Sequence, residues 1–333
     1  MSITVNITNE FMEAYCSTIK NGVEYVNLIF RNGSATFYCE CKDVFYMAIV
    51  PAKFSEDISL RLPVKTTSII FRCGKIDIDI TDKLLNITHT DTNDKITAVV
   101  TVAHGYCNLE SHIINMLRNS AQNSITITDT GIFKRALRLA RVTDVKGVQF
   151  NKGYAYAMSN GYLAYMRDQI GLTLSISNYA LRSLVNFIGN NNQCCISNYN
   201  GYNLCNVGFT VFGWRRARPT ECYDLSMIEY DYSTTLTTDL FKFLFSTFKN
   251  DMSSVTLDFS TGILECISTT GKYSLQTDIE ITKFEGSSIF KLNPNVLKDI
   301  VSNFAERVDL KVISSSTLAI VSDGIFYSIG GVQ

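Results

Sequence analysis

The sequence is poor in several residue types whose abundance would define a protein class. It has only 4 prolines and 3 histidines among 333 residues, and 30 basic against 31 acidic residues leave a net charge of -1. So few prolines exclude collagen-like and proline-rich disordered chains, and the charge balance gives no overall attraction to nucleic acid or anionic membranes. No run of 18 apolar residues occurs and the N-terminus lacks a basic stretch before an apolar core, so we expect neither a membrane-spanning helix nor a secretory signal.

Signals of catalytic or metal chemistry are equally scarce. The ten cysteines include no CxxC pair, and His89, His104 and His112 form no HxxxH or HExxH motif, whereas zinc sites usually need closely spaced ligand pairs. We therefore expect reduced thiols, no metal and no cofactor. There is no P-loop, GxGxxG or GxSxG motif, and Asp77 and Asp79 alternate with isoleucines, as on a strand with one solvated face. No catalytic residue is predicted, and we expect a protein that is not an enzyme.

A helix followed by a β-hairpin recurs along the chain. Apolar residues at helical spacing predict three helices that start about a hundred residues apart, at 10–20, 131–142 and 240–250. Each is followed by alternating strands around a turn signal. The three turn signals are Asn32-Gly33, Asn151-Lys152-Gly153 and Ser260-Thr261-Gly262. The recurrence predicts three similar domains.

Each predicted domain contains a second helix-and-hairpin unit. These second helices are expected near 64–74, at 178–190 and after Asn293, which caps a helix with Pro294 in its first turn. A helix with one apolar stripe has to bury it against a sheet or another helix. The sequence therefore predicts an α+β fold of three repeated domains, each with two helices packed on antiparallel sheet. The expected domain boundaries are 1–120, 121–225 and 226–333.

Three such domains in series can continue one sheet into the next, but they leave a free sheet edge at each end of the row. Exposed edges are a liability, and closure removes them. Two copies of the chain, head to tail, would form a six-domain ring. The chain is thus expected to be half of such a ring, with a second copy of itself as a partner.

The outward helix faces carry basic residues in a regular pattern. Lys134, Arg138 and Arg141 lie at i, i+4 and i+7 of one predicted helix, where like charges repel. Comparable positions of this and the other helices add Arg135, Arg182, Lys242, Lys249 and Lys298. A polyanion along this surface would relieve the repulsion, and phosphate contacts bind without reading sequence. The pattern favours double-stranded DNA as a partner; the alternative is a solvated basic face.

Several segments resemble the bacterial-type DNA polymerase III β subunit, the sliding clamp. Residues 253–271 and 290–333 follow that family's C-terminal domain element for element, and residues 145–165 resemble its GV…ATDGHRLA stretch. There, Ser159-Asn160-Gly161 stands where Thr-Asp-Gly is usual. A segment at 219–223 resembles the family's FPDY link before the third domain. The first third matches only in the order of elements, which suggests a divergent, phage- or virus-encoded member.

The resemblance implies a ring dimer that encircles duplex DNA and tethers a polymerase, with a clamp loader as a further candidate partner. Partners of that family insert a peptide into an apolar pocket between the second and third domains. Carried over by position, the pocket comprises Ser159, Gly161, Tyr162, Leu163, Ala164, Pro219, Tyr327, Ile329 and Val332. Because Tyr162-Leu163-Ala164 replaces the usual His-Arg-Leu, we expect a different partner motif. For Tyr162 and Leu163 the alternative is ordinary strand-end core.

Two other functions stay open at this point. A clamp-fold protein can serve as a transcription co-activator that recruits RNA polymerase, with the same ring and a different partner. The chain could also be a β-rich structural protein with no DNA role. Whether the clamp tethers a DNA polymerase or recruits RNA polymerase, we expect no membrane partner. We also expect a location in the cytoplasm of a bacterial cell, or of an infected host cell.

Overall fold

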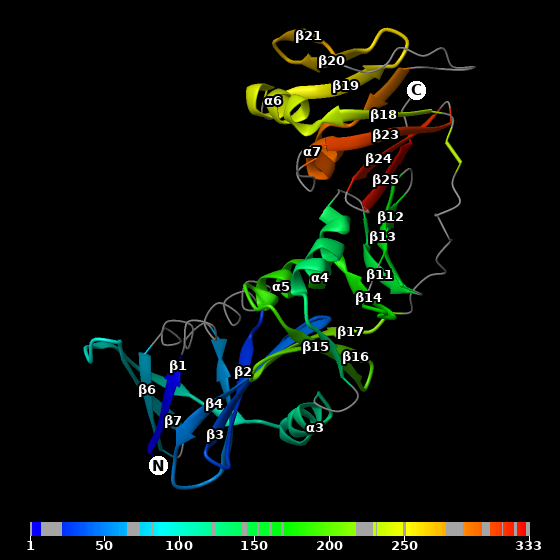
Figure 1. Ribbon diagram of the computed structural model, residues 1–333. Coiled ribbons are helices and arrows are strands. Elements are labelled where there is room, and N and C mark those ends of the chain that lie inside the picture. Colours follow the sequence, from blue (N-terminus) through cyan, green and yellow to red (C-terminus); the bar gives the residue numbers. More distant parts are fainter. Residues whose placement is uncertain are drawn as a thin grey trace. The chain divides into compact units, whose positions relative to one another are not determined.

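The protein consists of two compact units. The computed structural model describes residues 2–7, 22–64, 74–81, 83–120, 124–141, 145–151, 153–159, 162–167, 170–217, 229–230, 232–248, 251–277, 289–301, 307–314, 316–322 and 325–330. Unit 1 contains Met1–Phe133 and Tyr179–Ala217, and unit 2 contains Lys134–Asn178 and Arg218–Gln333. We describe each unit by itself (Figure 1).

Antiparallel strands dominate unit 1. Its strands are β1 (Ser2–Ile7), β2 (Tyr25–Arg31), β3 (Ser34–Cys41), β4 (Val44–Lys53), β5 (Ile58–Pro63), β6 (Gly74–Ile80), β7 (Leu84–Thr90), β8 (Ile96–Ala103), β9 (Gly105–Tyr106), β10 (Ile125–Ile127), β15 (Cys194–Tyr199), β16 (Tyr202–Val207) and β17 (Thr210–Arg215). Their main path runs β10-β15-β16-β17-β4-β1-β6-β7-β8, with β2, β3, β5 and β9 paired beside it.

Strand β4 joins the early strands of the chain to the later ones. It pairs with β3 from Val44 to Pro51, with β17 from Val44 to Ala48 and with β1 at Ala52 and Lys53. We call the pairing of β4 with β17 the first junction. It joins strands that are far apart in sequence into one sheet of unit 1.

Two helices cover opposite faces of the sheet at the first junction. Helix α5 (Asn178–Ile188) places Phe187 against Tyr46 and Phe212. Helix α3 (Glu110–Ser120) buries Ile113 and Met116 in a cluster with the neighbouring side chains of β4, β16 and β17, on the other face. Figure 1 shows α3 and α5 on the two sides of these strands. The sequence analysis did not predict α3.

The first junction depends on a close approach between Phe45 and Gly213. The two residues are direct partners across β4 and β17, and the ring of Phe45 contacts the rings of Tyr38 and Tyr202. A Cβ on Gly213 would lie 2.1 Å from the Phe45 ring, well inside van der Waals contact. Only glycine allows this ring to lie across the neighbouring strand.

Unit 2 contains two antiparallel sheets. Its strands are β11 (Gly147–Asn151), β12 (Tyr154–Ser159), β13 (Tyr162–Arg167), β14 (Leu174–Ser177), β18 (Tyr232–Thr237), β19 (Met252–Asp258), β20 (Ile263–Ser268), β21 (Gly271–Gln276), β22 (Ile289–Leu292), β23 (Arg307–Ser314), β24 (Thr317–Ser322) and β25 (Ile325–Gly330). Eight strands have the order β14-β11-β12-β13-β25-β24-β23-β18, and four have the order β21-β20-β19-β22. We call the pairing of β13 with β25 the second junction.

Helices α6 (Thr238–Phe248) and α7 (Pro294–Val301) pack against each other in unit 2, α6 also on β18 and α7 on β19. Helix α4 (Thr130–Leu137) crosses the boundary between the units and continues into a short 3-10 helix, η1 (Arg138–Arg141), which lies over β11, β12 and β13. The fold is α+β, with helices packed on antiparallel sheet, as predicted.

Local signals in the sequence placed several of these elements correctly. Asn32 and Gly33 both have positive φ, 53° and 72°, as a two-residue type I′ hairpin requires. The Asp129 carboxylate caps α4 by accepting hydrogen bonds from the amides of Gly131 and Ile132. Asn293 caps α7 through the Asn295 amide. The helices predicted at 178–190 and 240–250 are present as α5 and α6.

One predicted helix differs from the structure, and two others stay predictions. The helix expected at 131–142 is α-helical only to Leu137 and then tightens into η1. The helix expected at 10–20 lies outside the described residues. Of the helix expected at 64–74, only residues 64 and 74 are described. The three domain boundaries stay a prediction.

Replacing Gly213 by alanine tests the close approach at the first junction. Because Phe45 is fully buried and cannot move freely, we expect the Gly213→Ala variant to lower the free energy of unfolding by about 1–3 kcal/mol. Trp214, the single tryptophan of the chain, is buried next to this site, so its fluorescence during urea unfolding reports the change. In the control Gly105→Ala, nothing lies within 4 Å of the new Cβ. An unchanged transition in Gly213→Ala would contradict the packing described.

Candidate DNA interface and partner site

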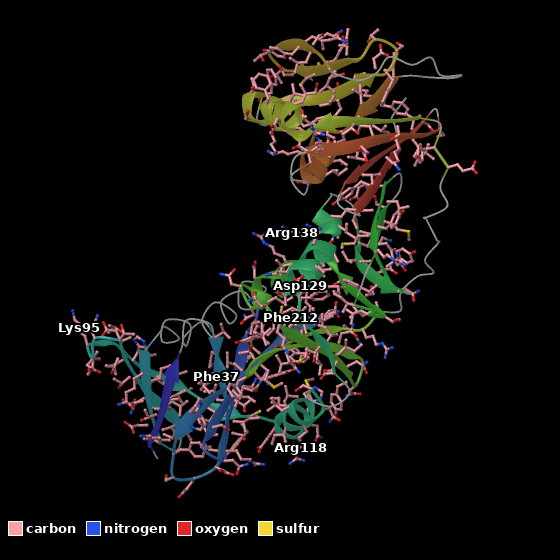
Figure 2. All side chains as sticks on the ribbon, viewed as in Figure 1. Phe37, Lys95, Arg118, Asp129, Arg138 and Phe212 are labelled. Carbon is pink, nitrogen blue, oxygen red and sulfur yellow. The ribbon has the colours of Figure 1, made fainter. Side chains whose placement is uncertain are left out.

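The basic residues of α4 and η1 are the first part of the candidate DNA interface. Arg135 and Arg138 are exposed, and Lys134 is half-buried. Figure 2 shows Arg138 extending from the protein surface. Arg138 begins the short 3-10 helix η1, whose backbone is kinked at Ala140. The side chain of Arg141 is outside the described part of the structure.

Helix α5 carries the next basic residue of the predicted set. Its buried residues include Leu181, Leu184 and Phe187, and Arg182 lies exposed on the opposite side of the helix. The sheet at the first junction separates α5 from α3, which exposes Arg118 on the other side of unit 1 (Figure 2). Unit 1 therefore has one exposed arginine on a helix of each face.

Helices α6 and α7 of unit 2 carry the other described residues of the predicted basic set. Lys298 on α7 is exposed. Lys242 on α6 is also exposed, but its ammonium lies 3.3 Å from the carboxylate of Asp239 one turn earlier. An exposed pair at this spacing contributes little to stability, although it offsets the local positive charge. Lys249 lies outside the described residues.

The second junction brings together much of the predicted partner site. Tyr162 pairs with Ile329 and with Ser159, and Ala164 pairs with Tyr327. Segments more than 150 residues apart in the sequence thus meet on adjacent strands. Gly161, Pro219 and Val332 belong to the same predicted site and lie outside the described residues, and Ile329 is placed by its backbone alone.

The strand alternation divides this set between two faces. Successive side chains of a strand point to opposite faces, so Tyr162 and Ala164 share a face on which both are buried, as is Tyr327. Leu163 lies on the other face and is half-buried. The structure therefore separates Leu163 from the rest of the predicted site.

Tyr162 is held firmly on the buried face. Its hydroxyl donates a hydrogen bond of 3.1 Å to the backbone oxygen of Leu139 in η1, and its ring lies 6.2 Å from that of Tyr327. Burial raises the pKa of Tyr162 well above its ordinary value of 10.0, and the neighbouring Tyr327 and Asp299, which disfavour a second negative charge, add to this shift. The phenol is therefore neutral at physiological pH, and Tyr162 is part of the core of the second junction.

No cluster of three or more metal-ligating side chains occurs among the described residues. The cysteines in this part of the chain are free thiols, all buried except Cys195, which is half-buried. No described helix is both long and apolar enough to cross a membrane.

The sequence matches no protein-family model, and no curated protein is similar enough to match. Solved structures are similar over the full length of the chain. One is the DNA polymerase sliding clamp of Bacillus subtilis, with a TM-score of 0.77 and 12% identity over 100% of this chain and 99% of that one. Others are the pol III beta of Caulobacter crescentus, with a TM-score of 0.77 and 13% identity, and a DNA polymerase III beta subunit of Eubacterium rectale, with 0.76 and 13%. Both of these cover 100% of each chain. The chain has the sliding-clamp fold.

Within the clamp fold, Tyr162 is anchored by Leu139, a residue that was not predicted from the sequence. Leu139 is fully buried, but it was not assigned to the apolar stripe of the predicted helix. The stripe was counted at 3.6 residues per turn, and the tightening into η1 after Leu137 turns Leu139 further round the axis. No signal in the sequence marks this change of helix type.

The hydrogen bond of Tyr162 predicts a pH-dependent difference between this clamp-fold protein and its Tyr162→Phe variant. At pH 7.5 we expect the variant to be less stable by about 1 kcal/mol, since it loses one buried hydrogen bond. Because the folded-state pKa is raised, the stability that the phenol contributes is fully present below pH 10 and decreases as the pH rises above that value. Urea unfolding followed by circular dichroism should show the difference shrinking at pH 10.5. A constant difference at both pH values would contradict the role given to the phenol.

Proposed function

We propose that this protein is a DNA sliding clamp, a ring that encloses duplex DNA and tethers a polymerase without chemistry of its own. The observation that carries the proposal is the similarity to sliding clamps along the entire chain, with TM-scores of 0.76–0.77 and complete coverage. Similarity confined to one domain would be compatible with many functions. A match that includes every unit supports the architecture on which encirclement depends.

The DNA contact is assigned to the helices. Arg135, Arg138, Arg182 and Lys298 are exposed on α4, η1, α5 and α7, and each can neutralise a phosphate. Contacts of this kind are independent of base sequence, which suits a protein that moves along DNA. Lys134, Arg141, Lys242 and Lys249 complete the proposed set.

Ring closure is assigned to a second copy of the chain. In the described residues, strand β8 ends the sheet of unit 1, and strand β21 ends the four-stranded sheet of unit 2. Ile96 and Val99 on β8 are 61% and 65% exposed, and Tyr273 on β21 is 38% exposed. Unpaired edges with apolar side chains favour pairing with another chain. The proposed protomer has three domains, 1–120, 121–225 and 226–333, and the proposed ring has six.

The partner site is assigned to the second junction, around Ser159, Ala164 and Ile329. Gly161, Pro219 and Val332 are its proposed further members. Because Tyr162, Ala164 and Tyr327 are buried there as core, they support the site from beneath, and the partner peptide is expected to contact Ser159 and the other residues around them. The proposed partners are double-stranded DNA, a DNA polymerase and a clamp loader, in the cytoplasm of a bacterial or infected cell.

Retention on circular DNA tests encirclement directly. After loading onto nicked circular duplex, we expect the protein to stay bound through gel filtration at a salt concentration that abolishes simple electrostatic binding. Linearising the DNA should release it, because a ring slides off free ends. Equal retention on circular and linear DNA would reject the ring mechanism, and no retention on either would favour a structural role without DNA.

Charge reversal of Arg182 tests which face of unit 1 contacts DNA. We expect the Arg182→Glu variant to bind duplex DNA more weakly, with the slope of log affinity against log salt reduced by about 1. The matched control is Arg118→Glu, since Arg118 is an exposed arginine on the helix of the opposite face. Fluorescence anisotropy with a labelled duplex over a salt series gives both slopes. Equal effects of the two variants would show that the α5 face is not the DNA-contacting face.

A further inference from the structure

Helix α3 is fastened at both ends to different parts of unit 1. At its first residue, the carboxylate of Glu110 forms an ion pair with Arg31 of β2 and accepts a hydrogen bond of 2.7 Å from the Ser59 hydroxyl of β5. At its last residue, the backbone oxygen of Ser120 accepts hydrogen bonds from Ser197 of β15, at 3.0 Å, and from Asn206 of β16, at 2.7 Å. The second pair satisfies a carbonyl that a helix end leaves without a partner in the helix.

The middle of α3 rests on the strands between these two anchors. Ile113 and Met116 are fully buried and join a cluster with Phe45 and Met47 of β4 and Val211 of β17. The helix thus spans the first junction, with one end on β2 and β5, which join β4 through β3, and the other on β16, which pairs with β17, and on β15 beyond it.

The first junction is consequently buried on both faces. From Val44 to Ala48, every residue of β4 is at most 1% exposed, irrespective of the face to which it points. On β17, Val211 faces α3 and is 5% exposed, and Phe212 faces α5 and is fully buried. Because a helix covers each face, we expect amides here to exchange slowly with water.

The second junction is fully buried on only one of its two faces. On β13, Tyr162, Ala164 and Met166 are buried on one face, whereas Leu163 and Tyr165 on the other face are only half-buried. The number of cross-strand pairs is the same, five at each junction. The difference between the junctions therefore lies in what covers them and not in the length of the pairing.

We propose that α3 is a brace across the first junction, which makes β4–β17 the stiff connection of the chain and leaves conformational adjustment to β13–β25. Local opening of a protein follows the regions with fewer buried apolar contacts. Bending at the second junction exposes less additional apolar surface, because one of its faces is already partly open to solvent. A consequence that rests on the proposed function is that a ring admitting DNA adjusts its shape at the second junction.

Hydrogen exchange of the full chain, followed by mass spectrometry, tests the brace without DNA. In the native protein we expect protection factors at Tyr46, Met47 and Phe212 at least tenfold higher than at Leu163 and Tyr165. Equal protection, or higher protection at the second junction, would overturn the proposal. Since no DNA, loader or partner is present, this result is separate from that of the circular-DNA experiment.

A variant of α3 then tests whether the helix is the cause. Met116→Asp places a charge in the cluster beneath α3, and we expect it to raise exchange at β4 and β17 at least tenfold while β13 and β25 change less than twofold. The matched control Asn115→Asp adds the same charge one residue earlier, on the exposed face of α3, and should leave both junctions unchanged. A uniform increase at both junctions would show that α3 stabilises the chain generally and is not a brace.

A milder substitution covers the case in which Met116→Asp fails to fold. Glu110→Gln removes the charge that pairs with Arg31 and leaves the buried face of α3 intact. We expect a threefold to fivefold rise in exchange within α3 and the flanking strands β2 and β5, and less than twofold within β13 and β25. No change in α3 and its flanking strands would overturn the anchoring role of its first residue.

Discussion

The structure depends on strand pairing between segments that are distant in sequence. Strand β4 pairs with β17, and β13 pairs with β25, so that about 160 residues separate the partners in each case. Pairing of this kind satisfies the backbone groups of strands that would otherwise be exposed edges. It also fixes the faces of the sheets, and with them the sides on which α3, α5 and η1 lie. The exposed arginines of these helices are positioned by the strands beneath them.

Features governed by local chemistry were predictable from the sequence. The Asn32-Gly33 turn follows from the positive φ that asparagine and glycine tolerate, and the caps at Asp129 and Asn293 follow from the unpaired amides of a helix start. Helix α3 was not predictable in this way. Its segment ESHIINMLRNS has a narrow apolar stripe, and the residues that bury Ile113 and Met116 come from β4, β16 and β17. Likewise, the requirement for glycine at position 213 arises only because Phe45 lies opposite it across β4 and β17.

The candidate site shows the same division between features that follow from local sequence and features that depend on distant segments. Exposure of Arg138, Arg182 and Lys298 follows from helical periodicity, which placed their apolar neighbours in the core. The partner site was placed by resemblance, and the pairing of β13 with β25 confirms that Tyr162, Ala164 and Tyr327 are neighbours. The resemblance gave no warning that Leu163 points to the other face, although the alternation of a strand would have shown it. Solved sliding clamps share this fold with the chain at only 12–13% identity.

The charge balance of the chain constrains how the proposed clamp holds DNA. A protein with a net charge of -1 has no long-range attraction to a polyanion, so association depends on a few local contacts. The four described basic residues that are exposed in one chain, each contributing about 0.9 to the salt slope, would weaken binding roughly a hundredfold between 50 and 200 mM salt, and the other proposed contacts would steepen this dependence. Contacts this sensitive to salt are a poor means of keeping a protein on DNA for long, and their independence of base sequence suits movement along it. Lasting association must then come from enclosure, which makes the integrity of the sheets, more than the strength of the phosphate contacts, the property on which the proposed function depends.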